Sequence, residues 1–272
     1  MNPVVPAIES LATSFNSLGL WRGEQNVWGK RMNANTFDRC LYLWMHRLGF
    51  MGKAEQRLMN RLIRPGMTVV DVGANIGLYS LFLAGLVGPQ GRVIAFEPDP
   101  DLVALLRANC TANGVGNVEA HHAALGSKAD RLMLQRLTIN SGENHLGSKG
   151  REAFRRPVEV DVAAFDALLP GSRPDFVKID VQGWELNVLR GMEATLRESN
   201  PVVFVEFWPD GLRRAGSEPI ELFSFVRDLG LDFYACDDGR QLSEAMFLDM
   251  AGRVKGMNYA NLLASRGGSP LA

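Results

Sequence analysis

Residues 69–80 read VVDVGANIGLYS, a short β-branched run followed by a small-residue turn and the start of a helix. The three valines predict a buried strand, and the apolar residues from Ile76 onward predict the helix. Gly73 and Gly77 predict a tight turn, because glycine adopts backbone angles and permits close approaches that a Cβ blocks. Such a turn at the carboxyl end of a strand places free backbone N–H groups beside a ligand. The stretch is therefore typical of a nucleotide site in an α/β protein.

The spacing within the turn distinguishes one nucleotide from another. The dinucleotide fingerprint G-x-G-x-x-G, counted from Gly73, needs glycines where this chain has Asn75 and Leu78. The chain instead has an acid followed by alternating small residues, Asp71, Gly73, Asn75 and Gly77. This order resembles the D/E-x-G-x-G-x-G motif of class I S-adenosylmethionine-dependent methyltransferases, with asparagine in place of the central glycine.

A second acid stands at the end of the next predicted strand. Residues 93–96 read VIAF, and Glu97 follows them immediately before Pro98. In a Rossmann-like fold, a carboxylate at this place accepts hydrogen bonds from a pair of ribose hydroxyls. A solvated loop acid is the alternative. The position of Glu97, one βα unit after the glycine turn, favours ribose binding.

Five segments taken together resemble the FkbM family of methyltransferases, in the same order along the chain. The segments are DVGANIGLYS (71–80), AFEPDP (95–100), LLRANCTANGVGNVEAHHAALG (105–126), FVKIDVQGWELNVLRG (176–191) and NPVVFVEFW (200–208). The resemblance extends from about Gly66 to the end of the chain and is faint before residue 50. Gln182 departs from it, because the family commonly has glutamate there, so a carboxylate role at that position is lost.

The resemblance implies an α/β, Rossmann-like class I methyltransferase fold, with a seven-stranded, mostly parallel sheet that contains one antiparallel strand. It implies an S-adenosylmethionine-dependent methyltransferase domain at residues 66–272, and the helical apolar spacing before Arg64 predicts a helical N-terminal extension at residues 1–65. The implied reaction is methyl transfer to a hydroxyl of a small molecule, a sugar or a natural product. The cofactor-binding residues would be Asp71, Gly73, Ala74, Asn75, Gly77, Glu97, Pro98, Ala123 and Asp180.

Composition limits the partners and the compartment. With 272 residues, of which 46% are hydrophobic, the chain can bury one large core plus an appendage. The formal net charge of -1 gives no general attraction to nucleic acids or membranes, and we expect neither as a partner. The three cysteines are far apart in the sequence, so they support neither a disulfide framework nor a zinc site. No signal peptide and no apolar run long enough to cross a membrane is evident. We therefore expect a cytoplasmic protein. The methyl acceptor and the oligomeric state do not follow from the sequence.

Strands and helices alternate from Met67 onward, in the rhythm of a parallel sheet. Predicted strands are Thr68–Val72, Arg92–Phe96, Val118–Ala124, Phe176–Asp180, Val202–Phe207, Phe233–Cys236 and Tyr259–Ala264; predicted helices run to about Val87, from Pro100 to Asn113, from Trp184 to Glu198 and from Ile220 to Leu229. Before Arg64 the apolar spacing is helical, with stripes in residues 36–48 and 58–63. These helices either pack against the sheet or form a lid over the substrate cleft that Trp21, Trp28 and Trp44 line.

The interval from Gly126 to Glu159 interrupts the alternation, apart from a predicted strand at Leu132–Leu137. It is long, polar and glycine-rich, which favours a functional loop. His145 lies in this interval beside the expected cleft, and an imidazole can accept a hydroxyl proton near neutral pH. The alternative is a solvated loop histidine.

Two further acids are candidates for catalysis. Asp180 ends a predicted strand at the sheet edge where ligands of α/β proteins bind, although it could instead cap the following helix. Glu206 stands within the apolar run VVFVEFW, where a charge is unfavourable unless it is paired or used. Two carboxylates suit Mg²⁺, but no third ligand is evident and Lys178 can neutralise one acid, so we expect no metal.

Two other function classes remain open at this point. An NAD-dependent oxidoreductase has the same alternation of strands and helices, but it needs the glycine spacing that this chain lacks. A nucleotide-binding module without catalysis would not need the acids Asp180 and Glu206.

Overall fold

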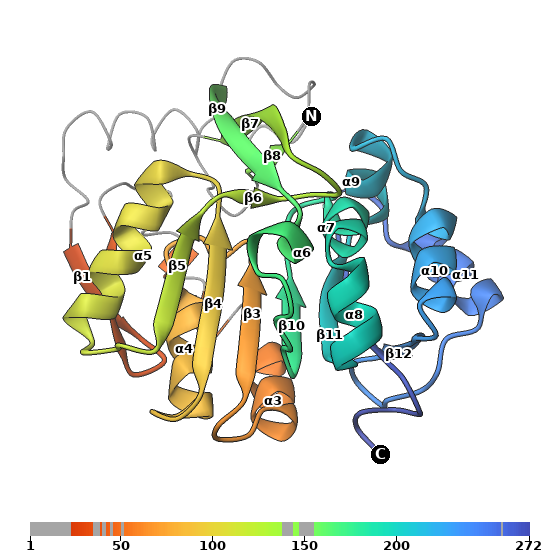
Figure 1. Ribbon diagram of the computed structural model, residues 1–272, viewed down its shortest axis with the longest axis horizontal. Helices are drawn as coiled ribbons and strands as arrows, with labels where there is room; N and C mark the ends of the chain where they lie inside the picture. The colour runs from red at the N-terminus through yellow and green to blue at the C-terminus, as the bar shows by residue number, and fades with distance from the viewer. Residues whose placement is uncertain are drawn as a thin grey trace.

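The computed structural model describes residues 23–34, 39, 42–43, 46–49, 52–137, 144–146, 155–256 and 258–272. A seven-stranded sheet forms the centre of the molecule, with helices on both faces (Figure 1). A four-stranded sheet lies across one end of the central strands. The predicted Rossmann-like α/β architecture is confirmed. Within the described ranges, no helix is long and apolar enough to cross a lipid bilayer.

The central sheet has the strand order β12-β13-β11-β10-β3-β4-β5. Its strands are β3 (Thr68–Val72), β4 (Arg92–Glu97), β5 (Val118–His122), β10 (Phe176–Ile179), β11 (Val202–Phe207), β12 (Asp232–Ala235) and β13 (Ala260–Ser265). Of these seven, β13 alone runs opposite to the other six strands, as expected. The chain proceeds from β3 outward to β5 and then returns to the other side of β3 with β10, so the strand order reverses beside β3. Ligands of doubly wound sheets bind at such a reversal.

Helices cover both faces of this sheet. They are α3 (Lys53–Leu62), α4 (Leu78–Val87), α5 (Pro100–Ala112), α6 (Phe165–Leu168), α7 (Glu185–Gly191), α8 (Glu193–Ser199), α9 (Pro209–Arg214), α10 (Pro219–Asp228) and α11 (Glu244–Arg253). The predicted helix from Trp184 to Glu198 is broken at Met192 into α7 and α8. Gly191 just before the break lies so close to the Gly126 carbonyl oxygen that a Cβ would be 2.0 Å from it. Helices α6, α9 and α11 were not predicted.

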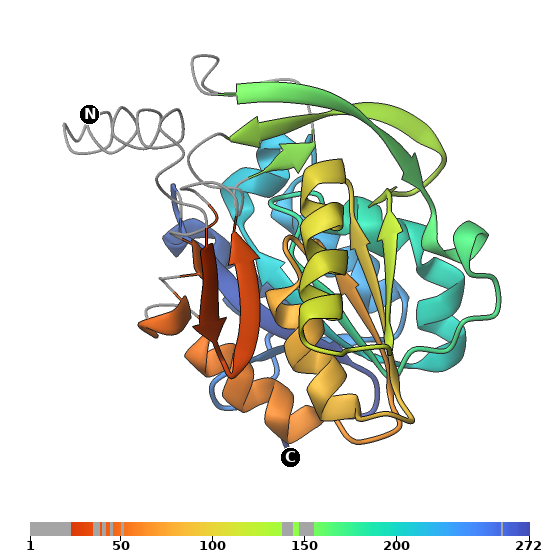
Figure 2. The same cartoon turned by 90° about the vertical axis from the view of Figure 1, so that its left-hand side faces the viewer.

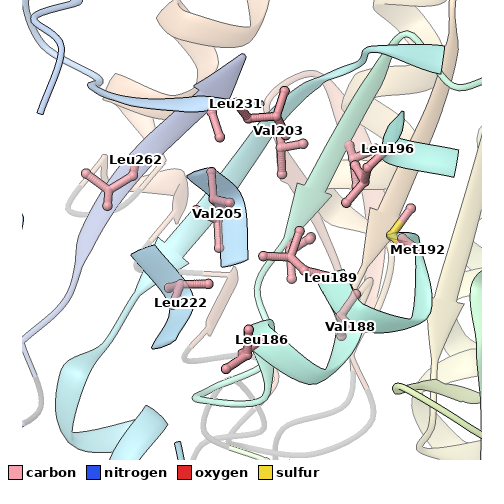
Figure 3. Packing of buried hydrophobic residues seen from close by; sticks show 14 of the residues in the cluster. Leu186, Val188, Leu189, Met192, Leu196, Val203, Val205, Leu222, Leu231 and Leu262 are labelled. Atoms are coloured by element: carbon pink, nitrogen blue, oxygen red, sulfur yellow. The ribbon is translucent and has the colours of Figure 1, made fainter. Parts of the chain in front are cut away.

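Side-chain alternation along the strands separates two apolar layers. Val203 and Val205 of β11 point to one face, where α7 and α8 cover them with Leu186, Leu189 and Leu196 (Figure 3). The opposite face, with Val69, Val93 and Phe176 among its residues, packs against α3 and α4. Strands buried on both faces read as near-continuous apolar runs, which is why the sequence located them so well.

The N-terminal segment contains a β-hairpin where helices were expected. Strands β1 (Gly23–Val27) and β2 (Lys30–Ala34) pair in antiparallel fashion around Trp28 and Gly29, both of which have positive φ. Two positive φ values at the turn match the twist of a tight hairpin. The backbone N–H groups of Arg31 and Asn33 donate to the side chains of Asn113 and Asn109 on α5, at 2.9 and 2.7 Å. These contacts are far apart in sequence, so apolar periodicity could not reveal them.

Of the expected helix at residues 36–48, the described residues 39, 42–43 and 46–47 are helical. Trp21 and Trp44 lie outside the described residues. Trp28 contacts Tyr79 and Phe82, with ring centroids 5.1 and 5.6 Å away, and it is not among the residues that line the cavity described below.

The predicted loop between Gly126 and Glu159 contributes to the second sheet. Its strands are β6 (Ala124–Leu125), β7 (Asp130–Leu137), β8 (His145–Leu146) and β9 (Arg155–Ala163), in the order β6-β9-β7-β8. The strand at Leu132–Leu137 was predicted, whereas β8 and β9 were not. Figure 2 shows β7 and β9 crossing above the end of α5 from which the chain enters that helix. This sheet therefore covers the carboxyl edge of the central sheet.

Candidate active site

A cavity opens at the carboxyl ends of β3, β4 and β10, beneath the second sheet. Its empty volume, including the mouth that is open to solvent, is about 750 Å³. Eight of the predicted site residues line it: Gly73, Ala74, Asn75, Glu97, Pro98, Ala123, His145 and Asp180. Asp71, Gly77 and Glu206 do not line it.

In the turn after β3, the backbone N–H groups of residues 73–77 are all taken up by hydrogen bonds within the protein. The first two donate to the carbonyl of Phe96 at 3.0 Å, the third to Oε2 of Glu97 at 2.8 Å, the fourth to Oδ1 of Asn75 at 2.7 Å and the fifth to the carbonyl of Ala74 at 2.9 Å. The prediction that this turn offers free N–H groups to a ligand is therefore wrong. A pyrophosphate would find no cradle of donors here.

The shape of the turn explains its residues. Gly73 has φ +79, and a Cβ there would lie 1.9 Å from the Asp180 carbonyl oxygen. Asn75, which replaces the central glycine of the motif, has φ 51. Asparagine tolerates this left-handed conformation because its short polar side chain can hydrogen-bond locally. Gly77, with φ +87, begins α4 and faces α5, where a Cβ would lie 2.9 Å from Leu106, so its role is structural.

Glu97 is the best-placed ligand acceptor in the cavity. Its side chain is buried, Oε1 accepts the Asp99 N–H at 2.9 Å, and Oε2 accepts the Asn75 N–H at 2.8 Å. Each carboxylate oxygen can accept a further hydrogen bond, so two acceptor positions remain. Burial raises the pKa of Glu97 to about 7, against the opposing effect of the two backbone hydrogen bonds.

Asp71 belongs to a buried ion pair and not to the cavity wall. Its Oδ1 lies 3.1 Å from Nζ of Lys178, and its Oδ2 accepts the Ser80 hydroxyl at 2.6 Å. Both partners of the ion pair are almost completely buried. Burial lowers the pKa of Lys178, but Asp71 and Asp180 more than compensate, so that pKa is raised. Asp71 is therefore the counter-ion of Lys178 and does not line the cavity, in contrast to the cofactor contact that we expected.

A glutamine joins the two acids that were predicted for catalysis. Nε2 of Gln182 donates to Oδ1 of Asp180 at 3.0 Å and to Oε2 of Glu206 at 2.7 Å. Asp180 lines the cavity with a third of its side chain exposed, and the residue that caps α7 is Trp184, so Asp180 is not that cap. Glu206 lies behind it, and burial followed by the charge of Asp180 raises its pKa well above the ordinary value.

Side chains that could bind a metal ion do not gather into a cluster in the described part of the chain. Among the described residues, no group of three or more histidine, cysteine, aspartate or glutamate side chains could hold a metal ion. Between Asp180 and Glu206 the structure places the amide of Gln182, a hydrogen-bond donor, where a carboxylate would be a ligand.

His145 belongs to a strand and lines the cavity. It pairs with Gln135 in the antiparallel β7–β8 ladder, and only 4% of the residue is exposed. The alternative of a solvated loop histidine is therefore excluded. Its neighbours Asn144 and Leu146 also line the cavity, so this short strand forms part of the cavity wall.

Four aromatic residues that line the cavity were not predicted as site residues: Tyr42, Tyr79, Phe96 and Trp184. Tyr42 and Tyr79 both line the cavity, and Nζ of Lys178 lies 5.1 Å from the centre of the Tyr79 ring. Burial and the nearby carboxylate of Asp180 raise the pKa of Tyr42 well above its ordinary value. Tyr79 was within reach of sequence reasoning, since it follows the glycine turn by two residues.

Comparison with known proteins places these features in one family. The profile of the methyltransferase FkbM domain matches residues 71–233. Methyltransferase sdnD of Sordaria araneosa is 34% identical over 196 residues, which are 60% of this chain and 73% of that protein. Hexuronic acid methyltransferase AglP of Haloferax volcanii is 30% identical over 133 residues, 49% of this chain and 53% of that protein.

A shorter match is more similar still. The 31-O-demethyl-FK506 methyltransferase FkbM of Streptomyces tacrolimicus is 53% identical over 53 residues, which are 20% of each protein. The last two matches thus span about half and a fifth of those relatives. With more than half of its length matched by the domain profile, the chain belongs to the methyltransferase FkbM family.

Proposed function

We propose that the protein transfers a methyl group from S-adenosylmethionine to a hydroxyl of a small molecule, either a sugar or a natural product. The observation that carries the proposal is Glu97, which lines the cavity beside the glycine turn with two acceptor positions remaining. Methyltransferase membership is established above. The cofactor, the oxygen acceptor and the site residues are the parts proposed here.

The cavity suits this cofactor better than a dinucleotide. Glu97 can accept the two ribose hydroxyls, while the turn at residues 73–77 has no N–H groups left for a pyrophosphate. S-adenosylmethionine has no phosphate and, when bound, supplies an electrophilic methyl group on a positively charged sulfur. The carboxylate of Asp180 faces the same cavity and favours a cation there. These contacts argue against the NAD-dependent alternative.

His145 is the proposed base. It is one of the residues that line the cavity, and an imidazole there can accept the proton of an acceptor hydroxyl. Asp180 is the second candidate for this role, and Glu206 supports it from behind through Gln182. Placing both reactants in one enclosed cavity would supply most of the rate enhancement. A non-catalytic binding module would not need these groups.

The acceptor class takes support from two relatives, whose names specify a hexuronic acid and 31-O-demethyl-FK506. Neither nucleic acid nor membrane is part of the proposal, and we place the protein in the cytoplasm. We also propose that residues 1–65 form an N-terminal extension and that residues 66–272 form the catalytic domain, which includes the matched range 71–233.

Methyl transfer itself tests the proposal. The protein is incubated with S-adenosylmethionine labelled in its methyl group and with two matched panels of sugars and natural products, one with free hydroxyls and one with the same hydroxyls blocked. We expect label to appear only in the first panel. Label on amines or carbon atoms, with none on hydroxyls, would contradict the oxygen assignment.

Removal of the Glu97 carboxylate should weaken cofactor binding. Glu97→Ala loses both ribose acceptors, so we expect the affinity for S-adenosylhomocysteine, measured by calorimetry, to fall by about 1 to 3 kcal/mol. Glu119→Ala is the control, because Glu119 lies on the adjacent strand β5 with an exposed side chain and does not line the cavity. Equal affinity in both variants, with the fold intact, would reject the role of Glu97.

Affinity should also depend on pH. With its pKa raised to about 7 by burial, Glu97 is a carboxylate above this pH and loses acceptor capacity as the pH falls through it. We expect S-adenosylhomocysteine to bind about tenfold more weakly at pH 6 than at pH 8, one pKa unit below against one above. Glu97→Gln should remove this dependence. Glu185→Gln should keep it, because burial also raises the pKa of Glu185 to about 7 but Glu185 does not line the cavity. A flat profile in the wild-type protein would count against the assignment.

We predict that turnover needs no divalent metal. Asp180 and Glu206 are the two acids that the sequence offered as possible Mg²⁺ ligands, and both accept a hydrogen bond from the amide of Gln182. Turnover should therefore be unchanged by EDTA. Loss of turnover in EDTA, with recovery on addition of Mg²⁺ but not of K⁺, would reverse the prediction.

A further inference from the structure

Arg136 of β7 connects the second sheet to the N-terminal end of α5. Its Nη2 lies 2.6 Å from Oδ1 of Asp99, and its Nη1 lies 3.1 Å from Oδ2 of Asp101. The Asp99 side chain is 2% exposed and that of Arg136 is 24% exposed, so the first of these ion pairs is shielded from solvent. Shielded, hydrogen-bonded ion pairs of arginine are stronger and more specific in geometry than surface pairs.

Asp99, the buried acid that pairs with Arg136, is hydrogen-bonded to Glu97 of the proposed ribose site. Asp99 caps α5 by accepting the Asp101 N–H at 2.9 Å, and its own N–H donates to Oε1 of Glu97 at 2.9 Å. Figure 2 shows the second sheet passing above this end of α5. Arg136 is therefore two contacts away from the carboxylate that we assign to the cofactor.

On its other side Arg136 is joined to the wall that carries His145. Gln135, the preceding residue, pairs with His145, and Leu134 pairs with Leu146. Leu134 and Arg136 share one face of β7 because side chains alternate along a strand. Leu134 is buried and lines the cavity, so this is the face turned toward the central sheet.

We propose that Arg136 is a positioning residue, which fixes the β7–β8 wall and its His145 at a set distance from the cofactor site by holding Asp99. The catalytic part of this inference rests on the proposed function. Arginine suits the role because its planar fork reaches two carboxylates at once, whereas a lysine ammonium would reach one. Arg131 offers a matched control on the same strand, because its pairs with Glu159 and Asp161 stay within the second sheet.

Amide hydrogen exchange tests the positioning without any assay of activity. In Arg136→Ala we expect the amides of residues 134–136 and 144–146 to exchange at least about tenfold faster, because local opening of a less anchored segment becomes easier. Arg131→Ala should leave these amides unchanged, and central strands such as β3 should keep their protection in both variants. Equal exchange in the two variants would overturn the proposal.

Kinetics tests the consequence. Arg136→Ala should lower kcat for methyl transfer roughly 10- to 100-fold, as expected when a catalytic group is displaced by about 1 Å, with a much smaller change in S-adenosylhomocysteine affinity. Arg136→Lys should recover part of the loss. His145→Ala should reduce kcat less in the Arg136→Ala background than in the wild type, since residues that act together are not additive.

The two measurements separate the possible failures. A wild-type protein that binds no S-adenosylmethionine and transfers no methyl group would end the proposed function, while the exchange result would still decide whether Arg136 anchors the wall. Altered exchange with an unchanged kcat, in a protein that does transfer methyl groups, would overturn the positioning role. Strictly additive effects of Arg136→Ala and His145→Ala would do so as well.

Discussion

His145→Ala should lower kcat for methyl transfer by roughly 10²- to 10⁴-fold, the range expected for loss of a general base. The affinity for S-adenosylhomocysteine should stay nearly unchanged, because His145 lies on β8, whereas the proposed cofactor contacts are Glu97 at the end of β4 and the turn after β3. With the cofactor saturating, the acidic limb of the pH–rate profile should disappear together with the activity. Steady-state kinetics on the accepted substrate provides the measurement.

His122→Ala is the control for this experiment. His122 is close to the same region, with Nε2 3.0 Å from the Pro98 carbonyl oxygen, but it does not line the cavity. Its replacement should leave kcat unchanged. Near-normal turnover in His145→Ala would reject the histidine as base and transfer that role to Asp180 or to positioning of the reactants alone.

Lys178→Met should lower the free energy of unfolding by about 3 to 5 kcal/mol, the loss expected when one partner of a buried ion pair is removed. Methionine keeps much of the side-chain volume but leaves the carboxylate of Asp71 buried, with the Ser80 hydroxyl as its remaining hydrogen-bond donor among the described residues. Adding Asp71→Asn should restore part of the stability, because the orphaned charge is then removed. Urea denaturation of the single and double variants measures both effects.

An exposed pair gives the comparison for Lys178. Arg253 and Asp249 lie four residues apart on α11, with most of both side chains exposed, so Arg253→Met should change stability by less than about 1 kcal/mol. A loss of similar size in Lys178→Met would show that the Lys178–Asp71 pair contributes little, and a double variant less stable than Lys178→Met would contradict the explanation by an uncompensated charge.

Local sequence determined the central part of this site. The β3 strand, the turn with Gly73 and the acid Glu97 were all located correctly, because strands buried on both faces are apolar runs and because a left-handed turn selects glycine. Asn75 departs from the D/E-x-G-x-G-x-G motif, and its positive φ explains why asparagine can replace glycine there.

Contacts between distant segments were out of reach. The N–H groups of the turn looked free in sequence, yet the Phe96 carbonyl of the neighbouring strand takes two of them. Asp71 looked like a ligand contact, yet it stands in register with Lys178 across the β3–β10 ladder, on the same face of the sheet. Pairing the two would have required the strand order as well as the alternation of side chains.

The hairpin and the second sheet were missed for a related reason. Strands β1 and β2 are short and polar, and they are held by Asn109 and Asn113 of α5, which no periodicity reports. His145 was placed beside the cleft correctly but in a loop, because a strand of two residues carries no recognisable pattern.

Calorimetric titration of the wild-type protein with S-adenosylhomocysteine and, separately, with NADH tests the central claim most directly. Because Glu97 is free to accept two hydroxyls and the turn at residues 73–77 has no N–H donors left for phosphates, we predict saturable binding of S-adenosylhomocysteine at one site per chain and no binding of NADH. Binding of NADH, with S-adenosylhomocysteine unable to bind or to compete, would contradict the account.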